Sequence, residues 1–308
     1  IRIYGIYRDP RQGMLWIASD GQGAVIYAKK YAIATNLMLN RISTELSRQV
    51  RSVMTDKYGG LWFGTKGDGL IHVPEYQDDL TSSASKAIVY APGKRVKASS
   101  YVKWDEEFHV YKLEQSRYMD GFWIGAGNPG LFYYSFKDDA LHPVENPSGQ
   151  PAIDVHDIYE ENDTTLYVVT AGVGFYKMIL EKKAGYVRIK EQKRYHFFYE
   201  QKEIAMFFPM LAEGDSLLWL GSRERGLVRF DKRTEEYRVI SLKEMLHRSV
   251  DDILSLHRDH EGKMYVGTTS GLVCLSFEGK QMKATYIGRE QGLLNDMIHG
   301  VLEDGNDF

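Results

Sequence analysis

Three features of the sequence predict an all-β fold built from one repeated sheet. An apolar–aromatic pair recurs six times, a glycine follows each aromatic residue at a nearly fixed distance, and an apolar pair usually precedes it. The 308-residue chain is 13% aromatic and contains 29 glycines, as expected for short strands joined by tight turns. Repeats of roughly 40 to 50 residues with four strands each are typical of a β-propeller.

The aromatic residues of the repeat are expected to be buried anchors. Successive anchors lie 46, 61, 44, 52 and 46 residues apart, and a glycine follows seven residues after each anchor, or six in the last repeat. A glycine at this offset predicts a hairpin turn with a positive φ. The strict period favours packing between blades over a role as exposed sugar-stacking platforms. The anchors are Trp16, Trp62, Trp123, Tyr167, Trp219 and Tyr265.

The segments around each anchor predict the other three strands of a blade. Apolar residues three apart precede an acidic residue such as Asp56, which indicates a first strand and a turn, although Arg117 takes the acidic position in the third repeat. A glycine two residues after the anchor, such as Gly64, predicts close packing against a neighbour. Residues such as 237–240 supply a fourth strand. Residues 292–304 restart the pattern, so we expect six full blades, the first strand of a seventh, and a seven-bladed ring in the full protein.

Residues 1–308 are expected to form a single propeller domain, excised from a larger protein. The long spacing before the third anchor predicts a loop or an extra hairpin inserted at 77–103. The chain begins at Ile1 without a signal peptide, and no run approaches the roughly 18 apolar residues of a membrane span. We therefore expect contact with a membrane only through segments outside this chain. Cys274 is the single cysteine, which excludes an internal disulfide framework and a cysteine-based zinc site.

The repeat resembles the two-component regulator propeller repeat. The segments Leu61–Thr65 (LWFGT) and Gly69–Leu70 match its pattern closely, and Leu218–Ser222 with Gly226–Leu227 match it in the fifth repeat. The resemblance implies the periplasmic part of an inner-membrane hybrid sensor of Bacteroides-type bacteria, which recognises oligosaccharides from polysaccharide breakdown. It also implies a neighbouring propeller or immunoglobulin-like domain in the same chain, a homodimer, and a histidine kinase outside this segment.

Composition and motifs favour a binding module over an enzyme or a nucleic-acid binder. The net charge of −3 lacks the basic excess that nucleic-acid binders usually carry. The nine histidines show no paired metal spacing, so we expect no catalytic residue, no cofactor and no metal. Two alternatives stay open: a structural or protein-interaction propeller without a small-molecule ligand, and a sialidase-like propeller. The turn at Thr55–Trp62 resembles a sialidase Asp-box, but its spacing from Asp56 to glycine is wrong by one residue.

The turns between the second and third strands of the blades are the predicted ligand-binding positions. In a propeller these turns gather on one axial face, and here their polar residues vary while the surrounding scaffold repeats. Variable polar tips on a rigid scaffold are where binding residues are expected. Two of them, Arg223 and Arg225, are suited to bidentate pairing with a carboxylate or sulfate on a sugar. The predicted ligand-binding residues are Lys66, Asp68, Asn128, Arg223 and Arg225.

Overall fold

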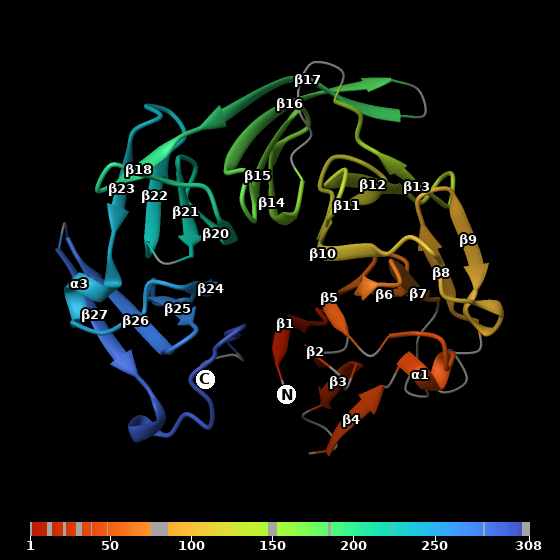
Figure 1. Cartoon of the computed structure of the whole chain (residues 1–308), viewed down its shortest axis with the longest axis horizontal. Helices are drawn as coiled ribbons and strands as arrows, with labels where there is room; N and C mark the ends of the chain where they lie inside the picture. Colours follow the sequence, from red (N-terminus) through yellow and green to blue (C-terminus); the bar gives the residue numbers. More distant parts are fainter. Residues whose placement is uncertain are drawn as a thin grey trace. The chain divides into compact units, whose positions relative to one another are not determined.

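The chain folds as an all-β propeller with four-stranded blades, which confirms the fold class predicted from the repeat (Figure 1). It divides into two compact units: unit 1 is Ile1–Leu166 with Met178–Gln192, and unit 2 is Tyr167–Lys177 with Lys193–Phe308. The single-domain boundary and the seven-bladed ring remain predictions. The computed structural model describes residues 2–10, 14–20, 23–28, 33–37, 39–47, 49–74, 86–146, 153–183, 186–223, 225–279 and 281–303.

The first three blades lie in unit 1, and in each of them strands that follow one another in the chain are hydrogen-bonded neighbours. The second blade has a fifth strand, and the first strand of the third blade also pairs with the second strand of the second blade. The strands are β1 (Ile3–Arg8), β2 (Leu15–Ser19), β3 (Gly23–Ala28), β4 (Ile33–Leu37), β5 (Val50–Thr55), β6 (Leu61–Gly67), β7 (Leu70–Val73), β8 (Ile88–Ala91), β9 (Lys94–Lys97), β10 (Phe108–Gln115), β11 (Gly121–Ala126), β12 (Leu131–Ser135) and β13 (Ala140–Pro143).

The fourth blade contains the division between the units, and the fifth and sixth blades lie in unit 2. A two-stranded hairpin precedes the fifth blade. The strands are β14 (Val155–Asn162), β15 (Thr165–Thr170), β16 (Phe175–Lys183), β17 (Tyr186–Tyr195), β18 (Phe197–Tyr199), β19 (Lys202–Ile204), β20 (Phe207–Glu213), β21 (Leu217–Ser222), β22 (Leu227–Asp231), β23 (Tyr237–Ile240), β24 (Ile253–Arg258), β25 (Met264–Thr268), β26 (Gly271–Glu278) and β27 (Gln281–Ile287). The short helices are α1 (Leu39–Ile42), α3 (Leu242–Leu246), η1 (Ala98–Ser100) and η2 (Arg289–Gln291).

The predicted insertion at 77–103 falls partly outside the described residues, because residues 75–85 are not described. In the remainder, β8 pairs with β7 as the fourth strand of the second blade, and β9 turns back onto β8 as a fifth strand. Among the described residues, no helix has the length and the apolar character that would let it cross a membrane.

The aromatic anchors occupy equivalent second strands and are buried, as predicted. Trp62 lies in β6 with no exposed surface, and Trp219 lies in β21 with 2% of its surface exposed. The ring of Trp62 contacts that of Phe122 from the next blade, with centroids 4.9 Å apart. The anchors therefore fill the space between neighbouring blades of one unit.

A carboxylate in the first turn of a blade fixes the anchor in place. Oδ1 of Asp56 accepts hydrogen bonds from the backbone N–H groups of Tyr58 (2.8 Å) and Gly60 (2.9 Å). Its Oδ2 accepts from the indole N–H of Trp62 at 2.7 Å. In the fifth blade, Glu213 accepts the indole N–H of Trp219 at 2.6 Å. The recurring acid is thus structural: it stabilises the turn and holds the anchor side chain.

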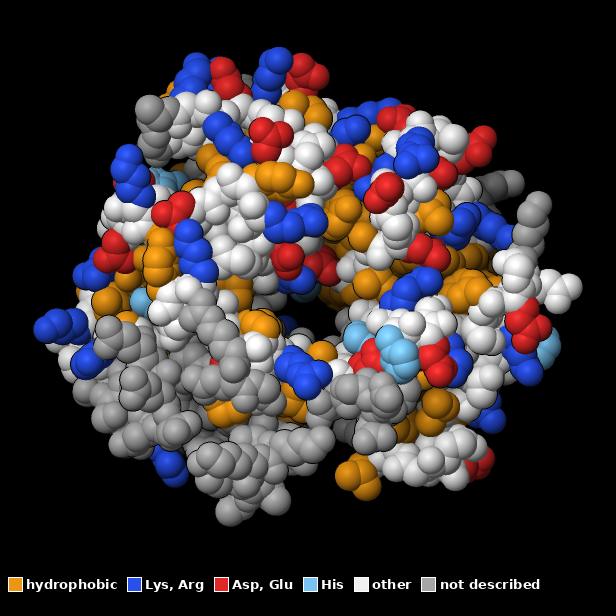
Figure 2. All heavy atoms as spheres, turned by 180° about the vertical axis from the view of Figure 1, so that it is seen from behind, with side chains coloured by type: hydrophobic (Ala, Val, Ile, Leu, Met, Phe, Trp, Pro, Cys, Tyr) orange, Lys and Arg blue, Asp and Glu red, His pale blue; other side chains and the backbone are white. Residues whose placement is uncertain are grey.

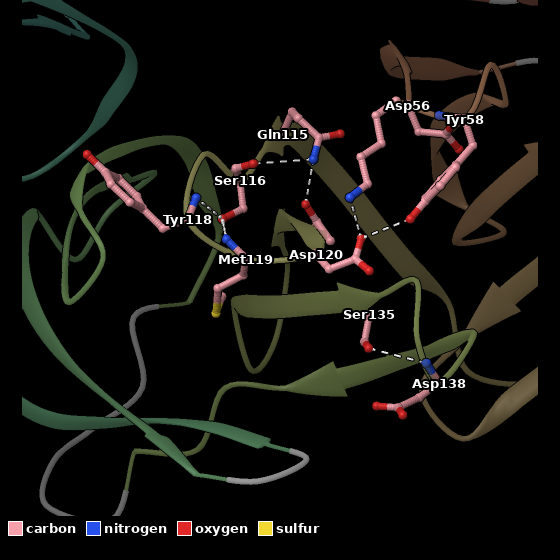
Figure 3. A network of polar contacts seen from close by, with 11 residues as sticks. Asp56, Tyr58, Gln115, Ser116, Tyr118, Met119, Asp120, Ser135 and Asp138 are labelled. Carbon is pink, nitrogen blue, oxygen red and sulfur yellow. Dashed lines mark hydrogen bonds and ion pairs between the residues drawn. The ribbon is translucent and has the colours of Figure 1, made fainter.

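The third blade replaces this arrangement with a bond to the fourth blade. Arg117 stands where the acid is expected, and the indole N–H of Trp123 donates instead to Glu160 of β14 at 2.8 Å. The Glu160 carboxylate is 3% exposed and also accepts from the Ser116 hydroxyl (2.8 Å) and the Arg117 backbone N–H (2.7 Å). The Ser116 hydroxyl in turn accepts from the backbone of Met119 at 3.0 Å, so the turn keeps its shape (Figure 3).

The glycine two residues after the anchor allows the next blade to approach closely, as predicted. A Cβ atom at Gly125 would lie 2.5 Å from the carbonyl oxygen of Val155, in the first strand of the fourth blade. At Gly267, a Cβ would lie 2.3 Å from the carbonyl oxygen of Ile298. The Ile298 backbone N–H donates to Thr268 at 2.9 Å. The segment after the sixth blade therefore docks where a further first strand is expected.

Trp219→Ala is expected to lower the free energy of unfolding by about 3–5 kcal/mol, the usual cost of deleting a large buried aromatic side chain. Leu294→Ala is the matched control, because the Leu294 side chain is 99% exposed and should contribute little. Chemical denaturation of both variants measures the difference. A Trp219→Ala variant as stable as the parent would contradict a core role for the anchor.

Gly125→Ala is expected to destabilise the protein by about 1–3 kcal/mol, because the added methyl group overpacks the contact with the fourth blade. Gly127→Ala provides a control in the same segment, since the nearest atoms to a Cβ there are 3.8 Å away. Thermal melts of the two variants should differ clearly. Equal melting temperatures would show that blade contact at Gly125 is looser than the structure indicates.

Candidate ligand-binding site

In every blade but the third, which has Ala126 in place of the hydroxyl residue, one repeated hydrogen bond closes the turn between the second and third strands. The Thr65 hydroxyl donates to the Gly69 carbonyl at 2.8 Å, and the Ser222 hydroxyl donates to the Gly226 carbonyl at 2.8 Å. Gly69 has φ +79°, and a Cβ there would lie 2.2 Å from the Tyr90 carbonyl oxygen. The scaffold therefore fixes each end of the turn, while the residues between are free to differ. The same bond closes the turns Ser19–Gly23, Thr170–Gly174 and Thr268–Gly271.

Lys66 and Asp68 share a turn of the second blade in unit 1 but have different surroundings. Lys66 is exposed, whereas Asp68 is 1% exposed. The Asp68 carboxylate accepts from the Ser47 backbone N–H (2.6 Å) and from the Tyr101 hydroxyl (2.8 Å). Burial raises the pKa of Asp68 and that of Tyr101. The carboxylate of Asp68 is thus engaged in holding the turn, and Lys66 is the residue that presents a charge to solvent.

Asn128 lies exposed on the third blade, in a turn linked to that of Lys66. The backbone N–H of Gly127 donates to the His109 carbonyl at 3.0 Å. His109 is the partner of Lys66 in the ladder between β6 and β10. His109, near the start of β10, therefore connects the two turns within unit 1: it pairs with Lys66 of one turn and accepts a hydrogen bond from Gly127, the neighbour of Asn128, in the other.

Arg223 and Arg225 lie in unit 2, in the turn between β21 and β22. The Arg223 side chain is 41% exposed, and its Nε forms an ion pair with Asp252 at 2.8 Å. Its guanidinium carbon lies 5.4 Å from the centre of the Phe208 ring. Arg225 is partly buried. A ligand at this turn would share Arg223 with Asp252. The ion pair with Asp252 fixes the position of the Arg223 side chain and partly neutralises the positive charge that a ligand would meet.

A second set of positions, partly buried, is created by β-bulges in the first strands. In β1, Ile3 pairs with Ser19 and Gly5 with Ala18, so the register shifts at Tyr4, which is the extra residue of a bulge. Arg51 in β5 and Tyr111 in β10 stand at the same bulge. A bulge leaves one residue unpaired and re-aims its side chain. The sequence analysis did not identify these residues. Their positions do have a sequence signal, because each directly follows the first of the two apolar residues that precede the anchor in its repeat.

The bulge side chains of unit 1 contact one another across neighbouring blades. The Arg51 guanidinium carbon lies 4.2 Å from the centre of the Tyr4 ring. The Tyr111 ring stacks on that of His156, with centroids 4.2 Å apart and planes 12° from parallel. Strand β1 contacts β5, β5 contacts β10, and β10 contacts β14 (Figure 1). Four successive first strands thus carry two contacting pairs of side chains, one across the first and second blades and one across the third and fourth.

Arg51 carries the charge of these two pairs at neutral pH. Burial lowers the pKa of His156 to about 3, and the positive charge of Arg51 adds to the effect. Burial raises the pKa of Tyr4 and that of Tyr111, against the opposing influence of Arg51. His156 and the two tyrosines are therefore neutral and can act as hydrogen-bonding or stacking groups.

The lowered pKa of His156 predicts loss of stability in acid. An unfolded histidine has a pKa of about 6.5, so between about pH 6.5 and 3 the unfolded chain binds more protons than the folded one. The contribution of His156 is full above pH 6.5 and is lost as the pH falls. His156→Gln should therefore make the free energy of unfolding less steep in pH over this window. Denaturation curves from pH 4 to 7 measure the slope, and an unchanged slope would refute the burial effect.

The described residues contain no group of three or more His, Cys, Asp or Glu side chains arranged to hold a metal ion. On the face shown in Figure 2, basic and acidic side chains of the described residues are intermixed. This pattern differs from the single-sign basic patch that marks a nucleic-acid interface.

Comparison with protein families confirms the resemblance seen in the repeat. Residues 44–67 match the family model described as "Two component regulator propeller". This segment contains the Asp56 turn and the Trp62 anchor of the second blade. No curated protein matches the chain.

Solved structures share the fold at low sequence identity. The extracellular domain of BT4673 from B. thetaiotaomicron, assigned to a hybrid two component system, superposes with a TM-score of 0.67 and 18% identity, over 98% of this chain and 35% of that one. The extracellular domain of BT3049 from the same organism gives 0.54 and 18%, over 99% and 43%. The WD40 β-propeller domain of Doa1 gives 0.64 and 12%, over 97% and 85%. The chain thus spans about a third to two fifths of the two ectodomains.

Proposed function

We propose that this chain is part of the extracytoplasmic sensor region of a hybrid two-component system and that it contributes to recognition of an oligosaccharide. The observation that carries the proposal is the contrast within these turns: the closing bond repeats in every blade but the third, while the polar tip differs. Lys66, Asn128, Arg223 and Arg225 are the tip residues proposed to bind, and Asp68 supports the turn of Lys66 from the interior. The family match and the ectodomain likeness support the sensor role.

In this proposal the chain performs no chemistry on the sugar. The Asp56 turn that resembles a sialidase Asp-box has its carboxylate buried and occupied by two backbone N–H groups and an indole. Those bonds account for the acid without a catalytic role. The recognised oligosaccharide would come from polysaccharide breakdown, and the kinase that responds would lie outside this chain.

Signalling requires that the ligand bind one conformation of the receptor better than another. Because blades of one unit interlock through bonds such as Trp123 to Glu160, movement is proposed at contacts with neighbouring domains. The partners proposed are a second propeller or an immunoglobulin-like domain of the same chain, and a second copy in a homodimer. The location proposed is the periplasmic side of an inner-membrane protein.

A structural or protein-interaction role without a small ligand is the second candidate. It is favoured by exposed tyrosines in the turns between first and second strands, where Tyr58 is 62% and Tyr118 47% exposed. Tyr58 is held there by contacts to Asp120, which also pairs with Lys57 at 2.7 Å (Figure 3). Aromatic side chains held at an exposed turn are suited to contact with another protein.

The sensor proposal is tested by calorimetry of the intact ectodomain with a panel of plant and animal oligosaccharides. The double variant Arg223→Ala/Arg225→Ala should bind at least tenfold more weakly with little change in melting temperature. Arg233→Ala/Arg238→Ala is the matched control, because both of its arginines are exposed in the same unit away from this turn, Arg233 between β22 and β23 and Arg238 in β23. Unchanged affinity in the first variant would place the site elsewhere. Turnover of a bound sugar would reject the non-enzymatic role, and absence of binding across the panel would favour the protein-interaction role.

A further inference from the structure

The bulge side chains of unit 1 include a guanidinium whose hydrogen-bonding capacity is not fully used. Nε of Arg51 is buried and has no hydrogen-bond partner among the described residues. Leaving a buried donor unsatisfied costs free energy, most of all for a charged group. The Tyr4 ring covers the guanidinium at 4.2 Å but supplies no acceptor in that contact. An anionic acceptor that reached the guanidinium would satisfy it after a small side-chain movement, since Nε is closed to solvent in the unbound chain.

We propose that Arg51, between Tyr4 and Tyr111, binds the carboxylate of an acidic sugar, a hexuronic acid residue of the oligosaccharide. The inference rests on the proposed sensor function and names the ligand class and the place of binding. A guanidinium matches a carboxylate with two parallel N–H donors. This geometry favours a planar carboxylate over a neutral hydroxyl as the group that Arg51 selects.

The two tyrosines are held in position by acids that do not pair with Arg51. The Tyr4 hydroxyl donates to Asp20 at 3.1 Å, and the Tyr111 hydroxyl donates to Asp154 at 3.3 Å. Their rings are thereby fixed on either side of the arginine strand, with one face of each already covered, by Arg51 on Tyr4 and by His156 on Tyr111. Rigid aromatic side chains lose little conformational entropy on binding, which favours their use in recognition.

His156 completes the second pair without adding charge. It stacks on Tyr111, and burial with the nearby charge of Arg51 keeps it neutral by lowering its pKa to about 3. A neutral imidazole can bond to sugar hydroxyls. A carboxylate bound at Arg51 would offset the arginine charge, so the pKa of His156 should rise when an acidic sugar binds.

The corresponding bulge in unit 2 has a different character. In β24, Ile253 pairs with Thr268 and Ser255 with Gly267, so the residue at the bulge is Leu254. In β20 the irregularity between Phe207 and Met210 contains Phe208 and Pro209. These apolar side chains offer nothing to a carboxylate. Arg223 lies over Phe208 but is already paired with Asp252 at 2.8 Å. The carboxylate contact at a bulge is therefore assigned to Arg51 in unit 1.

The test compares an acidic and a neutral probe on the intact ectodomain: a galacturonic acid trisaccharide and a galactose trisaccharide, by calorimetry. The parent protein should bind the acidic trisaccharide more tightly. Arg51→Gln should weaken that binding at least tenfold, and Arg51→Lys should weaken it by less because the charge remains. Arg95→Gln is the matched control, since Arg95 also lies over a tyrosine but is already paired with Asp139 at 2.7 Å.

A second readout is the pKa of His156 from NMR titration, which should rise with the acidic trisaccharide and not with the neutral one. If Arg51→Gln fails to fold, Arg51→Lys and the titration decide. Binding of the neutral trisaccharide alone, or acidic binding that survives both Arg51 changes, would overturn this inference and leave the sensor function standing. If the ectodomain binds oligosaccharides of neither kind, the proposed function fails and this inference with it.

Discussion

The hydrogen bond between an indole N–H and a carboxylate is the interaction on which the second, third and fifth blades depend. Burying a carboxylate is costly unless hydrogen bonds compensate it, and Asp56 receives three. Two of these bonds shape the turn between β5 and β6, and the third sets the position of the Trp62 ring. One side chain therefore couples the register of a hairpin to the packing of the interior.

The third blade shows that the carboxylate can come from elsewhere. With Arg117 at the usual position, the indole of Trp123 is satisfied by Glu160 from the next blade. The same carboxylate also accepts the Ser116 hydroxyl and the Arg117 backbone N–H. A bond that is local in the second and fifth blades becomes a bond between blades here. Its loss would loosen the contact of two sheets as well as one turn.

Much of the fold is predictable from the sequence because its signals are local and repeat. The spacing of Trp62 and Trp219 predicts second strands and burial, and Gly125 predicts close approach. The partner of Trp123 is not predictable, since Glu160 is 37 residues away and belongs to another sheet. Asp68 has the sequence context of a solvated turn residue, but Tyr101 from a segment 33 residues later covers it. Such pairings depend on tertiary contacts that a single sequence does not display.

The residues of the candidate site also differ in whether the sequence alone could identify them. The turn tips could be found from the sequence because they vary between fixed glycines, and Lys66, Asn128 and Arg223 are exposed as such tips should be. The bulge residues could not be found from the sequence. A bulge is a change of register between two strands, and no particular residue type marks it. Arg51 reads as an ordinary strand residue until its neighbours Val50 and Ser52 are seen to pair with consecutive residues of β6.

The hydroxyl–glycine bond that closes the turns of every blade but the third has a consequence for how such a protein can change. Because the bond joins a side chain and a backbone carbonyl at the two ends of the loop, it makes no demand on the residues between. Loop segments could thus be exchanged between blades, or between related proteins, while the strands on either side keep their pairing. Recombination within a repetitive gene would then produce new combinations of loops on an unchanged framework. Diversity of recognition would arise by shuffling rather than by point changes alone.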